Sequence, residues 1–346
     1  MECQVKKQHI FLCLCTLFFL FVGGIKVSAS EMSFAVQAII PENQIDKTQT
    51  YFDLQMQPGQ SQDLMVEMRN DTSEAVTVNV LPNTAITNQN GIVEYSDTTT
   101  ARDNSLKVGF KDIATTDKEV TIAAKSKKQI AVHVQMPKAS YDGVILGGIY
   151  FTEKNTQSEE KESKGSQIIN RYAYVIGVKL TETDKVINPE LRLNDVKATQ
   201  VNYRNVITAN IQNYTPSIIK DLKIDGKVYS KGGSKVLYSE SRENLRMAPN
   251  SNFDYAISLN NKPFKPGKYT FKGVAKSGDK EWKFEKDFEI KGEESRKYNK
   301  EAVSLEKDYT WIYILVGIVV VSILLIIILI LLKKLKNNKE TQEKVD

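Results

Sequence analysis

Hydrophobic and polar residues alternate with a period of two along most of the chain. Residues 64–68, 76–80 and 130–136 each place an apolar side chain at every second position. Successive side chains of a β-strand point to opposite faces, so each stretch predicts a half-buried antiparallel strand. Turn-forming pairs such as Pro58-Gly59 and Asn90-Gly91 separate these stretches. The pattern therefore predicts an all-β protein.

Both ends of the chain carry continuous apolar runs. Lys6 and Lys7 precede the first run, and Val27-Ser28-Ala29 supplies small residues at the spacing that signal peptidase reads. We expect a signal peptide over residues 1–29, with an uncleaved N-terminal anchor as the alternative. Residues 311–332 form the second run. As a helix this run would rise about 33 Å, enough to cross a hydrocarbon core of about 30 Å.

The charges beside the second run predict the orientation of the chain in a membrane. Lys333, Lys334 and Lys336 follow it directly, and the positive-inside tendency places residues 333–346 in the cytoplasm. The predicted protein is thus a single-pass cell-membrane protein whose bulk lies outside. Residues 293–310 are expected to form a charged juxtamembrane stalk.

Two apolar stretches in the middle of the chain, residues 144–151 and 168–180, flank a charged, serine-rich segment. They predict a long β-hairpin with a mobile, solvated tip. The pair Gly147-Gly148 indicates a bulge or a close backbone approach. We expect two immunoglobulin-like β-sandwich domains joined by this hairpin, plus the C-terminal transmembrane helix. The domains cover residues 30–152 and 188–292, and the hairpin and linker cover residues 153–187.

Composition narrows the class of protein. The formal charge is +5, but part of it lies in the two ends, and the segment between them is close to neutral. The basic balance therefore does not predict nucleic-acid binding. Cys3, Cys13 and Cys15 all lie in the predicted signal peptide, so the mature protein would have no disulfide. An exported β-protein without cysteine is typical of a Gram-positive cell surface.

The sequence carries no pattern that predicts catalysis. His133 is the one histidine beyond the predicted signal peptide, and it occupies a polar position of an alternating strand, so we expect it to face solvent. The chain lacks a Gly-X-Ser-X-Gly elbow and a phosphate-binding loop. One histidine without cysteine makes a poor transition-metal site. We predict a binding protein rather than an enzyme, with no catalytic residue, metal or cofactor.

The most distinctive local feature lies near the start of the predicted exported segment. Pro41, Asn43 and Gln44 predict an extended polar loop, and Tyr51 and Phe52 follow it. These five residues are the candidate ligand-binding loop, because amides can exchange hydrogen bonds with a ligand and rings can stack on sugar faces. The alternative is that the amides satisfy the loop backbone and the rings fill the core.

Several of these segments also resemble one family. Residues 34–37, 40–44 and 51–54 (FAVQ, IPENQ, YFDL), together with residues 147–151 and 260–269, resemble the WxL-interacting proteins of Gram-positive bacteria. Ala35 departs from the aromatic or serine expected there. The resemblance implies an N-terminal peptidoglycan-binding domain, a second domain that binds host extracellular ligands, and a partnership with surface proteins that carry the WxL module.

These observations predict a membrane-anchored cell-surface scaffold and adhesion protein that holds surface complexes against peptidoglycan. Exposed sheet edges can accept a partner strand, and moderate charge with aromatic and amide side chains suits recognition of wall components. The alternatives are an envelope sensor or assembly chaperone, and a cell-wall hydrolase. A hydrolase would require a cleft in which carboxylates converge.

Overall fold

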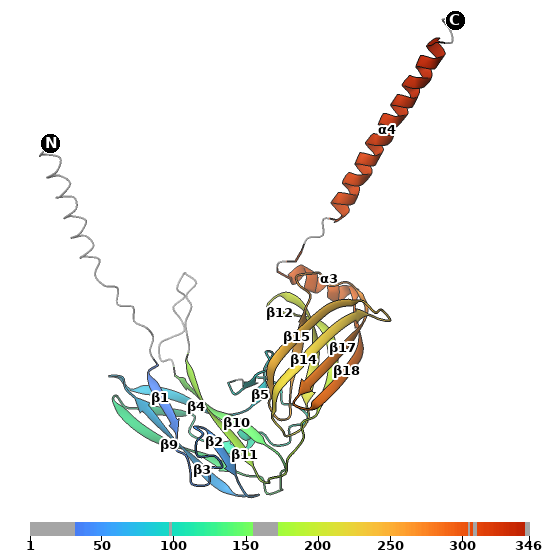
Figure 1. Cartoon of the computed structure of the whole chain (residues 1–346). Helices are drawn as coiled ribbons and strands as arrows, with labels where there is room; N and C mark the ends of the chain where they lie inside the picture. Colours follow the sequence, from blue (N-terminus) through green and yellow to red (C-terminus); the bar gives the residue numbers. More distant parts are fainter. Residues whose placement is uncertain (1–31, 97–98, 155–171, 304, 307–309, 343–346) are drawn as a thin grey trace, which may run out of the picture. The chain divides into compact units, whose positions relative to one another are not determined.

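The computed structural model describes residues 32–96, 99–154, 172–303, 305–306 and 310–342 (Figure 1). The predicted signal peptide, most of the connection between the two hairpin strands and the last four residues lie outside the described residues. Strands dominate the described part of the chain, and its helices are the short α2 (Phe110–Ile113), α3 (Gly292–Glu301) and the long α4 (Thr310–Gln342). The predicted all-β class is confirmed.

The first compact unit is a β-sandwich. One sheet has the strand order β1-β3-β9-β7 and the other has the order β2-β11-β10-β4-β8. The strands are β1 (Phe34–Ala38), β2 (Phe52–Gln55), β3 (Ser61–Asn70), β4 (Val76–Thr84), β7 (Ala114–Thr115), β8 (Glu119–Ile122), β9 (Ser126–Gln135), β10 (Ile145–Glu153) and β11 (Ala173–Thr181).

The period-two pattern fills the core of this unit as predicted. Leu64 of β3 lies opposite Val132 of β9, and both side chains are fully buried. Burying apolar surface of this kind contributes about 1.5–3 kcal/mol for each large aliphatic side chain. His133 occupies the other phase of β9, and its Nδ1 lies 2.8 Å from Asp63 Oδ1 on the exposed face. The solvent-facing position predicted for His133 is confirmed.

Strands β10 and β11 begin in the described parts of the two apolar stretches in the middle of the chain, and they are neighbours in one sheet. Gly147 of β10 lies directly against Phe110, so that a Cβ placed on it would be 2.3 Å from the Phe110 Cβ. This confirms the close approach that the paired glycines predicted. Gly177 of β11 is different, because a Cβ there would meet Tyr51 at 3.6 Å, an ordinary contact.

The second compact unit is also a sandwich, with strand orders β12-β13-β16 and β15-β14-β17-β18. Tyr255, Ile257 and Phe271 lie at the centre of its core. Its strands are β12 (Leu191–Val201), β13 (Arg204–Asn213), β14 (Ile219–Ser230), β15 (Val236–Met247), β16 (Ser251–Ser258), β17 (Gly267–Ser277) and β18 (Lys280–Ile290).

Residues 84–109 and 140–146 belong to this second unit, although they lie within the stretch predicted as the N-terminal domain. The first of these segments contains a two-stranded ribbon of β5 (Ile86–Thr87) and β6 (Val93–Glu94). Thr87 Oγ1 lies 2.6 Å from Ser251 Oγ, and Gly91 packs against Leu245. Alternation predicts a strand and its buried face, but it does not specify the core on which that face packs.

Helix α3 begins the segment that was predicted as a juxtamembrane stalk, and it is part of the second unit. Acidic residues in its first turn and Lys300 in its last turn favour the helix electrostatically. The Ser295 hydroxyl donates to the Phe264 carbonyl at 2.8 Å, and the Tyr298 ring lies 5.8 Å from the Phe264 ring. The helix therefore closes one end of the core.

Helix α4 contains the predicted apolar span. Residues Ile312–Leu331 have a mean hydropathy of 3.7, and the stretch is long and apolar enough to cross a membrane. Ser322 is polar, but its hydroxyl donates to the Ile318 carbonyl at 2.8 Å, one turn earlier in the same helix. The hydroxyl is thus satisfied without a partner helix.

A prediction about acid stability follows from Glu190 in the second unit. Its carboxylate accepts hydrogen bonds from Lys280 Nζ at 2.6 Å and Trp282 Nε1 at 3.0 Å. The bond from Lys280 and then that from Trp282 lower the pKa of Glu190 below its ordinary value of 4.5. A carboxyl whose pKa is lowered by folding stabilises the fold above its unfolded pKa, and this contribution disappears as the pH falls through the folded pKa.

We therefore expect Glu190→Gln to lower the free energy of unfolding at neutral pH by less than about 1 kcal/mol, since the pair is partly exposed. The difference from the wild type should shrink once the pH falls below 4.5. Urea unfolding at a series of pH values, followed by tryptophan fluorescence, measures the free energy of unfolding of both proteins. Both carry Trp311→Phe, which leaves Trp282 as the single tryptophan. A difference that stays constant with pH would contradict the prediction.

Candidate ligand-binding surfaces

The candidate loop connects β1 to β2, and the structure separates its five predicted residues into two groups. Gln44 is 5% exposed, and its Nε2 donates to the Tyr51 carbonyl at 2.8 Å while its Oε1 accepts from Asp53 N at 3.1 Å. Phe52 is fully buried. Gln44 and Phe52 therefore hold the loop and fill the core, which was the alternative interpretation. Pro41, Asn43 and Tyr51 remain at least partly accessible.

The same loop is fixed a second time, by Asp46. Its carboxylate accepts hydrogen bonds from Thr48 N at 2.9 Å, Thr48 Oγ1 at 2.6 Å and Gln49 Nε2 at 2.8 Å. The bond from Gln49 and then those from Thr48 lower the pKa of Asp46 to about 2. The carboxylate is therefore ionised at any physiological pH, and its three hydrogen bonds hold the turn.

The accessible part of the loop presents both apolar and amide groups. Ile45 is 56% exposed, and Ile39 is also exposed. Beside them, Asn43 and Gln62 exchange two amide hydrogen bonds of 2.9 Å each. We call Ile39, Pro41, Asn43, Ile45 and Gln62 the loop surface. The five predicted residues did not include Ile39, Ile45 and Gln62, although Ile39 begins the segment that the sequence marked as distinctive. An apolar residue inside a polar loop, as at Ile45, was the available signal.

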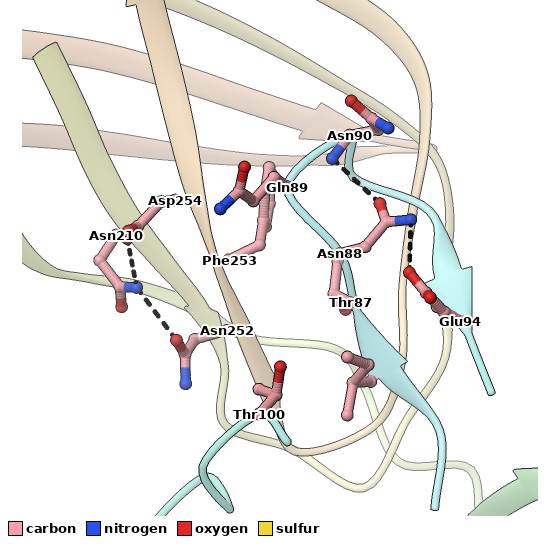
Figure 2. Close-up of a pocket in the computed structure, with 11 residues that line it drawn as sticks. Thr87, Asn88, Gln89, Asn90, Glu94, Thr100, Asn210, Asn252, Phe253 and Asp254 are labelled. Atoms are coloured by element: carbon pink, nitrogen blue, oxygen red, sulfur yellow. Dashed lines mark hydrogen bonds between the residues drawn. The ribbon is translucent and has the colours of Figure 1, made fainter. Parts of the chain in front are cut away.

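A second candidate surface lies in the second unit. It is a cavity of about 450 Å³ between the β5–β6 segment and strands β13 and β16 (Figure 2). A neighbouring hollow of about 140 Å³ shares Gln89, Asn90 and Asp254 with it. Most of the lining side chains are amides, carboxylates and hydroxyls, and we call the two spaces together the amide groove. The larger cavity is lined by Ile86, Thr87, Asn88, Gln89, Asn90, Glu94, Thr100, Asn210, Asn252, Phe253 and Asp254.

Hydrogen bonds hold the wall of the groove in place. Asn210 Nδ2 donates to Asn252 Oδ1 at 3.0 Å and to Asp254 Oδ1 at 2.8 Å (Figure 2). Behind this wall Asp103, which is 8% exposed, accepts from Gln212 Nε2 at 2.6 Å and from Asn252 Nδ2. Opposite it, Asn88 Nδ2 donates to Glu94 Oε2 at 2.9 Å.

Sequence reasoning missed the amide groove because its residues come from distant parts of the chain. The available signal was weak. Asn210 and Gln212 of β13, like Asn252 and Asp254 of β16, occupy the polar phase of their strands. The polar face of an ordinary solvent-exposed strand shows the same alternation. Only one difference marks the strands of the groove: their polar positions carry amides where exposed strands usually carry lysine and glutamate.

Neither surface has the composition of a metal centre. Among the described residues, no group of three or more His, Cys, Asp or Glu side chains could hold a metal ion. Glu94 and Asp254 both line the groove, but each accepts a hydrogen bond from a neighbouring asparagine. The arrangement suits recognition by hydrogen bonding.

Two family models match successive parts of the chain. Residues 34–153 match the family model of the WxL Interacting Protein, peptidoglycan binding domain, and residues 163–300 match the model of the host binding domain. No curated protein matched the chain.

Solved structures gave only distant likenesses. The CsuC–CsuE chaperone–tip adhesion subunit complex of Acinetobacter baumannii is 12% identical, with 73% of this chain and 98% of that chain covered and a TM-score of 0.33. The Escherichia coli chaperone DraB is 12% identical, with 75% and 98% covered and a TM-score of 0.27. At these TM-scores the likenesses support no conclusion about function.

Proposed function

The chain belongs to the WxL-interacting protein family, and from this premise we propose that it is a membrane-anchored cell-surface scaffold that attaches to peptidoglycan. The two matched domains are binding domains rather than enzymatic ones. The observation that carries the proposal is the match of residues 34–153 to the peptidoglycan-binding model, in the part of the chain that also holds the loop surface.

The chemistry of the loop surface suits an N-acetylated glycan strand. An acetamido group offers a methyl group, a carbonyl and an N–H. The exposed Ile45 can contact the methyl group, and the amides of Asn43 and Gln62 can exchange hydrogen bonds with the other two. Because Gln44 and Asp46 fix the loop backbone, the surface is formed before the ligand arrives. Tyr51 and Pro41 complete the proposed contact.

Helix α4 would provide the anchor. The stretch Ile312–Leu331 contacts lipid in this proposal, with residues 333–346 in the cytoplasm and both sandwiches outside. The satisfied hydroxyl of Ser322 favours an anchor over a helix that recognises a membrane partner, as an envelope sensor or assembly chaperone would require. The family assignment adds two proposed classes of partner: surface proteins with a WxL module, and host extracellular ligands that bind the second domain.

A sedimentation experiment tests wall binding. The full chain, purified in detergent, is mixed with insoluble peptidoglycan and centrifuged, and the bound fraction is measured over a range of protein concentrations. We expect saturable binding, and we expect the double substitution Asn43→Ala, Ile45→Ser to raise the Kd about tenfold, equivalent to about 1.4 kcal/mol. Both side chains are exposed, so the fold should persist.

Gln129→Ala is the matched control, since it removes an exposed amide from β9 in the same sandwich, away from the loop. Its Kd should equal that of the wild type. Wild-type protein that remains in the supernatant would sink the proposal. Release of soluble muropeptides during the incubation would instead indicate a wall hydrolase.

A further inference from the structure

We propose that the amide groove of the second unit is a binding site for a short neutral oligosaccharide. The inference goes beyond attachment to peptidoglycan, because the loop surface and the groove belong to different units. A volume of about 450 Å³, extended by the hollow of about 140 Å³, lies in the usual range for small-molecule sites.

The first observation is a buried hydroxyl without a partner. Thr208 of β13 is 2% exposed and lines the smaller hollow, and its Oγ1 makes no hydrogen bond among the described residues. Burying an unpaired hydroxyl costs free energy, so such groups are rare in folded proteins and call for an explanation. A ligand hydroxyl in the hollow would either donate to Thr208 Oγ1 or accept from it.

The second observation is the state of the amides along the groove. Asn210 donates both N–H groups of its amide, to Asn252 and to Asp254, and its Oδ1 accepts from Asn194, so it keeps only one acceptor position. Asn252 donates one N–H to Asp103 and keeps one donor and one acceptor position, whose directions these bonds fix. Gln89 and Asn90 are exposed, and in Figure 2 the only bond drawn at Asn90 is the one from its backbone N to Asn88 Oδ1, which leaves its side-chain amide free to meet a ligand. Amides carry donors and acceptors together, as sugar hydroxyls do, so one groove can bind several ring hydroxyls in sequence.

The charges in the groove disfavour an anionic ligand. Glu94 and Asp254 face the larger cavity, and both can accept from sugar hydroxyls. Arg242 is the cation of the smaller hollow, but its Nη2 donates to the Ala256 carbonyl at 3.1 Å and its Nε lies 3.6 Å from Glu240. A sulfated or sialylated oligosaccharide would therefore be repelled by two carboxylates. The one cation lining the smaller hollow already has partners within the protein.

The lining also favours a glycan over an extended peptide. Peptides bound as added strands require a free strand edge together with apolar pockets for alternate side chains. The groove instead presents side-chain amides, and the ring of Phe253 is almost fully buried. Recognition would thus depend on hydrogen bonds rather than on ring stacking.

The placement of the groove decides how it must be tested. Residues 86–100 lie within the match to the peptidoglycan-binding model, whereas β13 and β16 lie within the match to the host-binding model. A fragment of residues 163–300 would lack Gln89, Asn90 and Glu94. The site therefore requires residues 86–100 together with β13 and β16.

The experiment uses the full chain in a detergent without sugar head groups, applied to an array of neutral, sialylated and sulfated oligosaccharides. We expect neutral structures to bind and their anionic counterparts to bind at least tenfold more weakly. Titration with the best neutral trisaccharide should then show at least a fivefold higher Kd for Thr208→Val and for Asn90→Ala, with no change for Gln129→Ala.

Thr208→Val also separates recognition from folding. It keeps the side-chain shape and removes the unpaired hydroxyl, so its melting temperature should rise while its affinity falls. Several results would overturn the proposal: no binding of any neutral glycan, wild-type affinity in Thr208→Val, or a preference for sulfated oligosaccharides. Binding of an unstructured peptide that Asn90→Ala abolishes would overturn it too. Thr208→Val should still sediment with peptidoglycan, so failure of the groove and failure of wall binding are distinguishable.

Discussion

Replacing Gly147 with alanine should destabilise the first unit by about 3 kcal/mol, the upper part of the usual range for overpacking a core. A Cβ at this position would lie 2.3 Å from the Phe110 Cβ and 2.4 Å from its Cγ. Because the nearest atom is bonded to the backbone, no rotation of the ring can relieve the overlap. The fully buried Phe110 also has no space into which it could retreat. Strand β10 or helix α2 would have to shift.

Gly177→Ala is the matched control on the neighbouring strand. Its new methyl group would meet Tyr51 at 3.6 Å, so we expect a neutral or slightly stabilising effect, since alanine lowers the entropy of the unfolded chain. Native-state hydrogen exchange measures the two effects, because it reports the amides of the first unit separately from those of the second. Equal protection in the two variants would contradict the proposed role of Gly147.

Gly147 also illustrates how much of the fold the sequence specifies. The glycine pair predicted a close approach, but its partner Phe110 lies in a part of the chain where no pattern marked it. Likewise, alternation predicted β3, β4 and β9, whose alternate apolar side chains are buried in one core. Alternation could not predict that residues 84–109 fold with the second unit. A two-stranded ribbon has the same sequence pattern whether it packs on the core of the first unit or on that of the second.

The candidate site shows the same limit at the level of side chains. The sequence placed a polar loop between strands, but the loop is not extended as predicted: it folds into turns in which Gln44 N donates to the Pro41 carbonyl and Gln49 N donates to the Asp46 carbonyl, each at 3.2 Å. Whether an amide such as Gln44 faces a ligand or its own backbone depends on where the carbonyl of Tyr51 lies, and that position is set by tertiary packing. The amide groove was beyond prediction for a related reason, since its two walls meet only after the second unit folds.

Replacing Asp103 with alanine should destabilise the second unit by about 3 kcal/mol. The carboxylate accepts from Gln212 Nε2, Asn252 Nδ2, and the backbone and hydroxyl groups of Ser105. Gln212 is almost fully buried, so its amide would lose its partner without gaining water. Leaving buried donors unsatisfied costs about 1–3 kcal/mol each, and hydrogen bonds to a charged acceptor lie at the upper end.

Two further variants show whether the acceptor itself is responsible. Asp103→Asn keeps the shape but turns one acceptor into a donor that faces Gln212 or Asn252, so it should cost about 2 kcal/mol. Asp195→Ala removes an exposed carboxylate from β12 in the same unit and should cost less than about 0.5 kcal/mol. Urea unfolding, followed by Trp282 fluorescence in the Trp311→Phe background, gives the free energy of unfolding of the three variants. If Asp103→Asn were as stable as the wild type, the donors of Gln212 and Asn252 would have other acceptors, and the wall of the amide groove would not depend on this carboxylate.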